Sequence, residues 1–230
     1  VVSIFEDRDL VSAPVIDKNN ILIGRITIDD VVDVIREESE STVLNMAGLT
    51  DEEDIFAPIL PSARRRAIWL GINLITALIA SGVISLFQDT IEKVVALAVL
   101  MPIVASMGGI AGSQTLTLVI RGIALGNISS ANSKSLLIKE ILIGLLNSLL
   151  WASVIGVLSS YWFNNYLIGI VIGIAMIANL GFAALSGVVI PIILKKIGVD
   201  PALAGGVILT TITDVIGFFS FLALGTFFLL

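Results

Sequence analysis

The sequence predicts an all-α polytopic membrane protein: five transmembrane helices, preceded by a partial α/β domain and an amphipathic connecting helix. Hydrophobic residues make up 57% of the 230 positions and charged residues only 14%, an apolar share well above that of a soluble domain. The charges are also unevenly placed, because only five of the nineteen acidic residues follow residue 66. A soluble core could not hide the long apolar runs that remain, so this second part belongs in a bilayer.

Residues 1–38 are typical of a soluble α/β domain. A short strand is predicted over residues 13–17, ending in a polar turn, and the β-branched run 21–28 predicts a second strand. Asp29 or Asp30 is suited to cap the helix that follows. Because the chain opens in what looks like the middle of a domain, we expect it to be part of a longer protein with further N-terminal sequence.

A polar connector follows this domain. Residues 39–57 predict a helical segment with five acidic side chains, and a linker containing Pro58 and Pro61 continues to residue 63. The rest of the chain, residues 64–230, is predicted to be the membrane domain.

Five apolar runs in this domain each exceed the roughly 20 residues that cross a hydrocarbon core. The predicted spans are residues 67–87, 94–120, 141–163, 166–194 and 201–230.

The loop charges predict the orientation of these spans. With the N-terminal region in the cytoplasm, the outer loops (88–93 and 164–165) carry one basic residue, Lys93, and the cytoplasmic flanks carry eight. These eight are Arg64, Arg65, Arg66, Arg121, Lys134, Lys139, Lys195 and Lys196. This positive-inside asymmetry predicts a protein of the plasma (inner) membrane with an extracytoplasmic C-terminus.

Composition excludes several classes of function. The chain is acidic, with a pI near 4.6, and has no basic patch to neutralise phosphate, so nucleic acid is not an expected partner. It contains neither Cys nor His, which rules out a disulfide framework, a thiolate metal site and an imidazole ligand. Any metal must therefore be held by oxygen.

Asp214 is the most informative residue. It lies near the middle of the last predicted span, where a charge costs several kcal/mol and usually marks an ion pathway. Thr210 and Thr211 lie one turn before it on the same helical side, and Gly217 lies one turn after it. The alternative is a structural Asp kept protonated or satisfied by hydroxyls, but no Lys or Arg lies within a predicted span to pair with it.

The second predicted span has an unusual composition. Pro102 is followed by Gly108, Gly109 and Gly112, a pattern that favours a helix which bends or loosens at membrane depth. The alternative is close helix packing, since Gly108 and Gly112 form a GxxxG pair. Both can hold. Asn147 and Asn179, in the third and fourth spans, are predicted to make interhelical hydrogen bonds.

The acidic residues of the front region suggest a second kind of site. Like charges repel one another, and a hard divalent cation relieves that repulsion. We therefore expect a regulatory cation site as an alternative to a merely solvated face. The cluster consists of Asp29, Asp30, Asp33, Glu37, Glu38 and Glu40.

Three segments together resemble the MgtE family of magnesium channels and transporters. Residues 24–33 (GRITIDDVVD) look like the end of a CBS (cystathionine-β-synthase) domain. Residues 101–126 (MPIVASMGGIAGSQTLTLVIRGIALG) are similar to the second span of that family, and residues 198–225 (GVDPALAGGVILTTITDVIGFFSFLALG) to its fifth. The resemblance covers essentially the whole chain.

The resemblance implies a homodimer in the lipid bilayer, with a pore between the protomers that is lined by the second and fifth spans. Asp214 matches the pore carboxylate, completed by backbone oxygen near Thr210 and Gly217. Further predicted pore-lining residues are Gly108, Gly109, Gly112, Gln114, Gly206 and Thr211. The connector matches a plug helix that closes the pore when cytosolic Mg²⁺ fills regulatory sites. The regulatory residues implied are Asp30, Asp33, Glu38 and, at the cytosolic mouth, Asp200.

The predicted function is therefore import of Mg²⁺ through a channel or transporter, with Mg²⁺ as transported and regulatory ion and no organic cofactor. Oxygen ligands suit this hard cation, and a site of two carboxylates can hold it through its water shell. The chain departs from the family at Ile110, where many members have Asn, and at Gly206, where they have a polar residue.

Three alternatives stay open beside this prediction. The first is a secondary transporter of divalent cations (Mg²⁺, Co²⁺ or Mn²⁺) coupled to H⁺ or Na⁺. The second, a non-transporting sensor, would not need Asp214. The third, an intramembrane enzyme, is not expected, because aspartyl chemistry needs two carboxylates in one site.

Overall fold

The computed structural model describes residues 1–49, 56–128 and 132–230. It divides into two units, Val1–Ser62 and Ala63–Leu230. The second unit holds five helices long and apolar enough to cross a membrane, which confirms the predicted fold class and span count. Residues 50–55, within the predicted connector, lie outside the described residues.

The first unit contains a small antiparallel sheet and two helices. Helix α1 (Val2–Asp7) precedes strands β1 (Ser12–Ile16) and β2 (Leu22–Thr27), which pair with Ser12 opposite Thr27 and an irregularity between Val15 and Ile16. Both predicted strands are confirmed. In the turn between them, Asp17 Oδ1 accepts hydrogen bonds from the backbone N–H groups of Asn19 and Ile21, each at 2.8 Å.

Helix α2 (Ile28–Met46) follows β2 directly. Its N-cap is Thr27, not Asp29 or Asp30, and Asp30 instead completes a capping box three residues later. Asp30 Oδ2 accepts from the Thr27 backbone N–H and hydroxyl, both at 2.9 Å, which satisfies donors that the first turn leaves without helical partners. The helix runs unbroken across residue 38, so the predicted front domain and connector share one helix.

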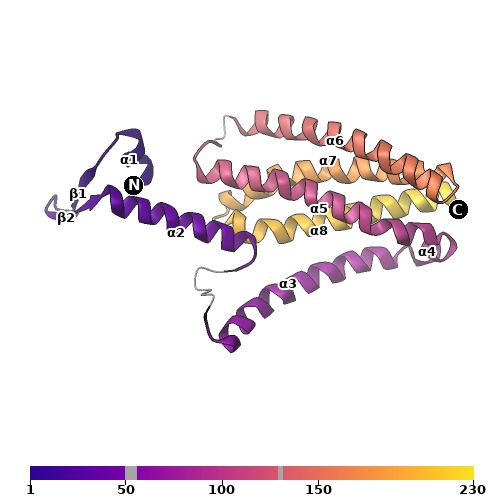
Figure 1. The fold of residues 1–230 in the computed structure, drawn as a ribbon, viewed down its shortest axis with the longest axis horizontal. Helices are drawn as coiled ribbons and strands as arrows, with labels where there is room; N and C mark the ends of the chain where they lie inside the picture. Colours follow the sequence, from indigo (N-terminus) through magenta and orange to yellow (C-terminus); the bar gives the residue numbers. More distant parts are fainter. Residues whose placement is uncertain (50–55, 129–131) are drawn as a thin grey trace. The chain divides into compact units, whose positions relative to one another are not determined.

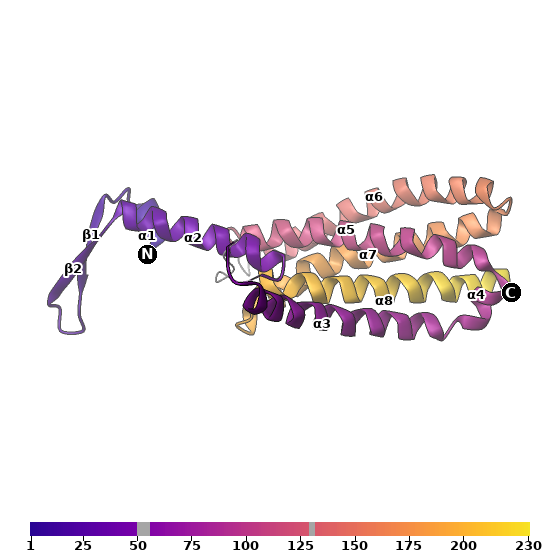
Figure 2. The same cartoon turned by 60° about the horizontal axis from the view of Figure 1, so that its bottom comes forward.

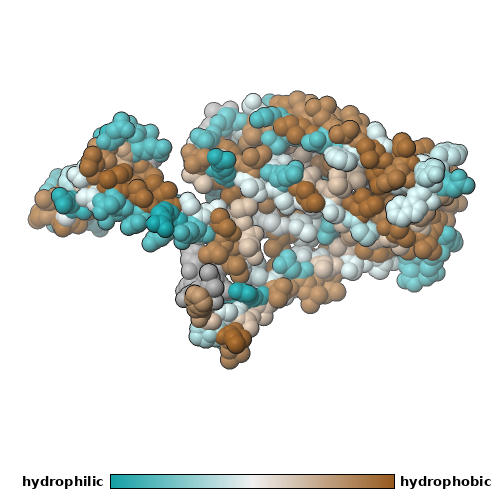
Figure 3. Space-filling model, in the orientation of Figure 1, coloured by the Kyte–Doolittle hydropathy of each residue, from teal (hydrophilic) through white to brown (hydrophobic). Residues whose placement is uncertain are grey.

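The second unit is a bundle of long helices. They are α3 (Ile59–Ser85), which begins in the first unit, the short α4 (Gln88–Lys93), α5 (Val95–Ala124), α6 (Ser133–Trp162), α7 (Tyr166–Lys196) and α8 (Pro201–Leu229). Helix α7 packs against α5, α6 and α8, whereas α3 and α6 lie on opposite edges of the bundle (Figures 1 and 2). Figure 3 shows hydrophobic side chains over much of the visible face of this unit.

The proline and glycines of α5 do not break the helix. It is continuous from Val95 to Ala124 with Pro102 inside. A Cβ on Gly108 would overlap the Asn179 side chain of α7, and one on Gly112 would lie 2.9 Å from Leu209 Cδ1 of α8. The structure thus confirms close packing at the GxxxG pair and shows no loosened segment.

Helices α5 and α8 approach each other closely along much of their length. A Cβ on Gly205 or Gly225 would lie 3.2 Å from Leu116 Cδ1 and 2.8 Å from Leu97 Cδ1, respectively. Small residues allow such close approach, and in a membrane close approach is what holds helices together. These two helices carry all of the predicted pore residues.

Candidate functional site

Asp214 occupies the centre of the last helix. It is the fourteenth of the 29 residues of α8, so about 20 Å of helix separates it from each end. Its side chain is half-buried. No described residue donates a hydrogen bond to its carboxylate or forms an ion pair with it. An acid at this depth without a protein partner needs water, a proton or a cation beside it.

Two threonines precede Asp214 and shape its surroundings. The Thr210 hydroxyl donates to the Gly206 carbonyl at 3.0 Å, and the Thr211 hydroxyl donates to the Val207 carbonyl at 2.7 Å. Each hydroxyl donates its one hydrogen bond to the helix backbone, so its oxygen lone pairs are left as acceptors. Because Thr210 is exposed and Thr211 half-buried, both oxygens are suited to face a cation or its water shell.

The backbone oxygens predicted beside Asp214 also have hydroxyl partners. The Gly217 carbonyl accepts from Ser220 at 3.2 Å, and the Thr210 carbonyl accepts from Thr213 at 3.0 Å. Gly217 itself is buried. Carbonyls with a helical and a hydroxyl donor are weaker ligands for a bare cation than open ones, which favours a cation bound through its own water.

Helix α5 has an open face with polar side chains. Ser113, Gln114 and Thr117 are exposed, and with Gly109, Ile110 and Leu118 they line a shallow groove of about 710 Å³. Polar groups in hydrocarbon are costly, so a face of this kind belongs against water or protein. Gly109 and Gln114 of the predicted pore lining lie on this face, whereas Gly108 and Gly112 pack inside the protomer.

The two intramembrane asparagines differ. Asn179 Nδ2 donates to the Val104 carbonyl of α5 at 2.7 Å, which confirms the predicted interhelical bond. For Asn147 the prediction is wrong, because its side chain is exposed on α6 and has no partner among the described residues. It lies on an outward face of α6, where no neighbouring helix of the described chain reaches it.

Glu140 is a residue that the sequence reasoning missed. Helix α6 begins at Ser133 rather than near residue 141, which brings Glu140 into the helix, and the side chain is 6% exposed. Its Oε2 accepts from the Thr115 hydroxyl of α5 at 3.2 Å. The signal available in the sequence was the spacing: Glu140 lies two turns from Ser133, at the start of an apolar run rather than in a loop.

The predicted regulatory residues lie on two elements, α2 and the start of α8. Asp200 is the N-cap of α8 and accepts from the Ala202 backbone N–H at 2.9 Å, while Asp33 and Glu38 are exposed on α2. The backbone N–H of Thr27 lowers the pKa of Asp30. Among the described residues no three carboxylates lie close enough to hold a metal ion, so the regulatory site stays a prediction.

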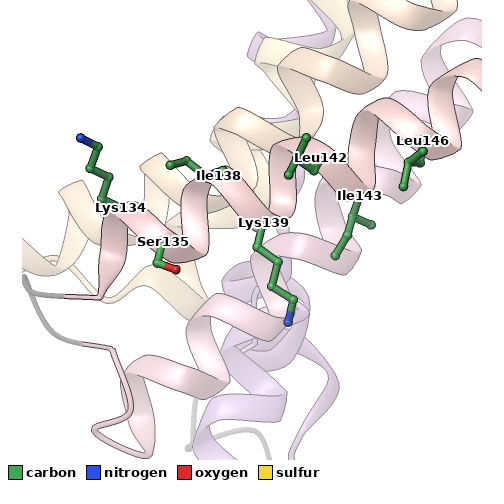
Figure 4. Close-up of a pocket in the computed structure, with 7 residues that line it drawn as sticks. All are labelled: Lys134, Ser135, Ile138, Lys139, Leu142, Ile143 and Leu146. Atoms are coloured by element: carbon green, nitrogen blue, oxygen red, sulfur yellow. The ribbon is translucent and has the colours of Figure 1, made fainter.

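A second groove lies on α6 and does not gather ligands for a cation. Its volume is about 660 Å³. Figure 4 shows that the Lys134 and Lys139 side chains point in different directions from this helix. The remaining lining is Ser135, Ile138, Leu142, Ile143 and Leu146. Two ammonium groups repel cations, so this groove plays no part in the site.

Comparison with known proteins identifies a family and several relatives. A family model, MgtE, described as a divalent cation transporter, matches residues 101–224. The chain is similar to the magnesium transporter MgtE of Bacillus subtilis (strain 168), with 32% identity over 229 residues, which is 100% of this chain and 51% of the relative. It is also similar to that of Enterococcus faecalis, with 32% identity over 93% of this chain and 47% of the relative.

The magnesium transporter MgtE of Thermus thermophilus is 30% identical over 97% of this chain and 50% of the relative. The chain therefore spans about half the length of the curated relatives it matches. The family model covers both the open face of α5 and the centre of α8.

Proposed function

Since this chain belongs to the MgtE family, we propose that it forms the membrane pathway of a magnesium transporter. The observation that carries the proposal is Asp214, a carboxylate at the centre of α8 with no protein partner among the described residues. The similarity to proteins named as magnesium transporters supports Mg²⁺ as the substrate.

The pathway lies between two copies of the chain. The polar, open face of α5 and the half-buried Asp214 both need water or protein against them, and a twofold pore supplies both. Two Asp214 carboxylates then face each other across the axis, with the Thr210 and Thr211 oxygens beside them. The homodimer and its pore are part of the proposal.

Mg²⁺ binds at this site with most of its water shell. The ion takes oxygen ligands in a near-ideal octahedron and gives up its waters reluctantly. Carboxylates supply charge, while the threonine hydroxyl oxygens accept hydrogen bonds from the bound waters. Such outer contacts select a doubly charged hydrated ion and hold it weakly enough for release, which conduction requires.

Cytosolic Mg²⁺ closes the pathway by binding acidic residues of the front region and the cytosolic mouth, including Asp33, Glu38 and Asp200. The exposure of Asp33 and Glu38 on α2 supports this part, because exposed carboxylates are free to take a cation. Asp30 contributes less, since one of its oxygens already caps the helix.

Substitution of Asp214 tests the proposal. In Mg²⁺ flux into proteoliposomes, Asp214→Ala should reduce uptake by at least about 100-fold, because an interaction of a few kcal/mol with the ion is lost. The matched control is Asp89→Ala, an exposed carboxylate on α4, which should transport normally. Normal uptake by Asp214→Ala, in protein that is folded, refutes the assignment.

Coupled transport is the second candidate function, and Glu140 is the observation that favours it. A buried carboxylate without a basic partner among the described residues is suited to carry a proton or Na⁺. Imposed H⁺ or Na⁺ gradients separate the two candidates: a channel passes Mg²⁺ regardless of them, whereas a coupled transporter follows them with a fixed stoichiometry.

A further inference from the structure

We propose that Asn179 is a positioning residue for Asp214: its buried carboxamide fixes α8 against α5 at the level of that carboxylate. This inference rests on the proposed function, because it assigns Asn179 a part in ion transport rather than in packing alone. It comes from a point where three helices meet at one side chain, Asn179 of α7 between α5 and α8.

The carboxamide of Asn179 is completely enclosed. The side chain is 0% exposed, and Nδ2 donates to the Val104 carbonyl of α5 at 2.7 Å. That carbonyl belongs to a helix interior, so it already faces the N–H of Gly108 one turn later. The bond therefore ties α7 to a fixed point on α5 without disrupting the helix.

Glycines on two helices make room for this group. A Cβ on Gly108 of α5 would overlap Nδ2 and would lie 2.8 Å from Oδ1. A Cβ on Gly217 of α8 would lie 2.7 Å from Nδ2 and 3.2 Å from Val104 Cγ1. Neither glycine leaves room for a side chain here, so the amide is one of several contacts that set how closely α5 and α8 approach.

Gly217 lies three residues after Asp214 on the same helix. Three residues turn an α-helix by about 300° and advance it by about 4.5 Å, so the backbone that the amide contacts is close to the one that carries the acid. A change in the size or polarity of residue 179 therefore moves Asp214 relative to the open face of α5.

The oxygen of the same amide is left without a partner. Asn179 Oδ1 is buried and accepts no hydrogen bond from the described residues. An unmet buried acceptor costs about 1–3 kcal/mol, and an apolar side chain of similar size would avoid that cost. A packing role alone does not account for an amide here, whereas a requirement for the Val104 bond does.

The test replaces Asn179 by Leu, which keeps the branched shape and the number of non-hydrogen atoms of the side chain and removes the hydrogen bond. Asn147→Leu on the exposed face of α6 is the matched control. In Mg²⁺ uptake by proteoliposomes, Asn179→Leu should raise the half-saturating Mg²⁺ concentration by roughly tenfold, because a displaced Asp214 binds the ion less well by about 1.4 kcal/mol. It should also lower the preference for Mg²⁺ over Ca²⁺, while Asn147→Leu changes neither.

A merely structural role gives a different result. If Asn179→Leu lowers only the amount of folded protein, with unchanged half-saturation and ion preference per folded molecule, the inference is overturned. Asp214→Ala is measured beside it. If Asp214→Ala loses uptake but Asn179→Leu keeps its half-saturation and ion preference, only the inference is refuted. If Asp214→Ala takes up Mg²⁺ normally, both the proposed function and the inference are refuted.

A second pair of variants covers the case in which Asn179→Leu does not fold. Gly217→Ala should fail because its methyl group meets Asn179 Nδ2, and Asn179→Ala/Gly217→Ala should recover folding because the smaller residue makes room. The double variant should still show the raised half-saturation and the lost ion preference. Normal half-saturation and preference in the double variant overturn the inference.

Discussion

Helices α7 and α3 are both long and apolar, yet they have opposite surroundings. Sixteen of the 31 residues of α7 are buried, whereas Ala80 is the one buried residue among the 27 of α3. The difference lies in the small residues. Cβ atoms on Gly169 and Gly187 of α7 would meet neighbouring helices, and Cβ atoms on Gly71 and Gly82 of α3 would meet nothing within 4 Å.

This comparison teaches that hydropathy and packing are separate properties of a membrane helix. Lipid tails are as apolar as Leu, so an apolar surface gives no reason for two helices to associate. Association needs close approach or polar contacts, and α7 has both. Helix α3 has the hydropathy of a span without the contacts of a core helix.

The largest effect is expected at Gly169. A Cβ there would overlap the Gly156 carbonyl of α6 and the Ser160 hydroxyl, and a backbone carbonyl cannot rotate away. Gly169→Ala should therefore destabilise the bundle by about 1–3 kcal/mol, the usual cost of overpacking, measured by unfolding in mixed detergent micelles. Wild-type stability of the Gly169→Ala variant would show that α6 and α7 pack less tightly around residue 169 than these contacts indicate.

A smaller effect of opposite sign is expected at Gly82 in α3. Because space around it is open, Gly82→Ala should leave packing intact and stabilise the helix by about 0.5–1 kcal/mol through reduced backbone freedom. The same unfolding measurement applies. A clear loss of stability would mean that another protein surface covers α3, and the contrast with α7 would then be limited to a single protomer.

The smallest effect is expected at the exposed start of α2. The Thr27 backbone N–H holds the pKa of Asp30 below its usual value. The ionised carboxylate therefore stabilises the helix at every pH above that usual pKa. The contribution is lost as the pH falls through the lowered pKa. The protection factor of the Thr27 amide, which compares its exchange rate with the intrinsic rate at the same pH, should fall over that acidic range. Asp30→Ala should show the lower protection already at neutral pH.

A protection factor at Thr27 that stays constant as the pH falls would show that Asp30 does not hold the cap.

The sequence sufficed for the features that depend on local composition. The five spans, the two strands and the central place of Asp214 in the last helix all follow from residue type and spacing. The interhelical bond of Asn179 was also predictable. Its partner was not, because the Val104 carbonyl comes from a residue 75 positions away.

What sequence reasoning missed depends on which face of a helix is covered. Asn147 and Asn179 have the same side chain at similar depth, and only tertiary packing places one at the centre and the other outside. Glu140 escaped notice because the third span was predicted to begin at residue 141, immediately after it. Helices α1 and α4 are short, and helices of six residues leave little periodic pattern to detect.

The length of the helices has a consequence for the lipid that the protein needs. At 29–31 residues, α5 to α8 are each about 45 Å long, which matches a bilayer with its headgroups rather than its hydrocarbon alone. In a thinner membrane such helices tilt, kink or thicken the bilayer around them. Because Ala80 is the one buried residue of α3, we expect this first span to change its tilt with less repacking than the other four.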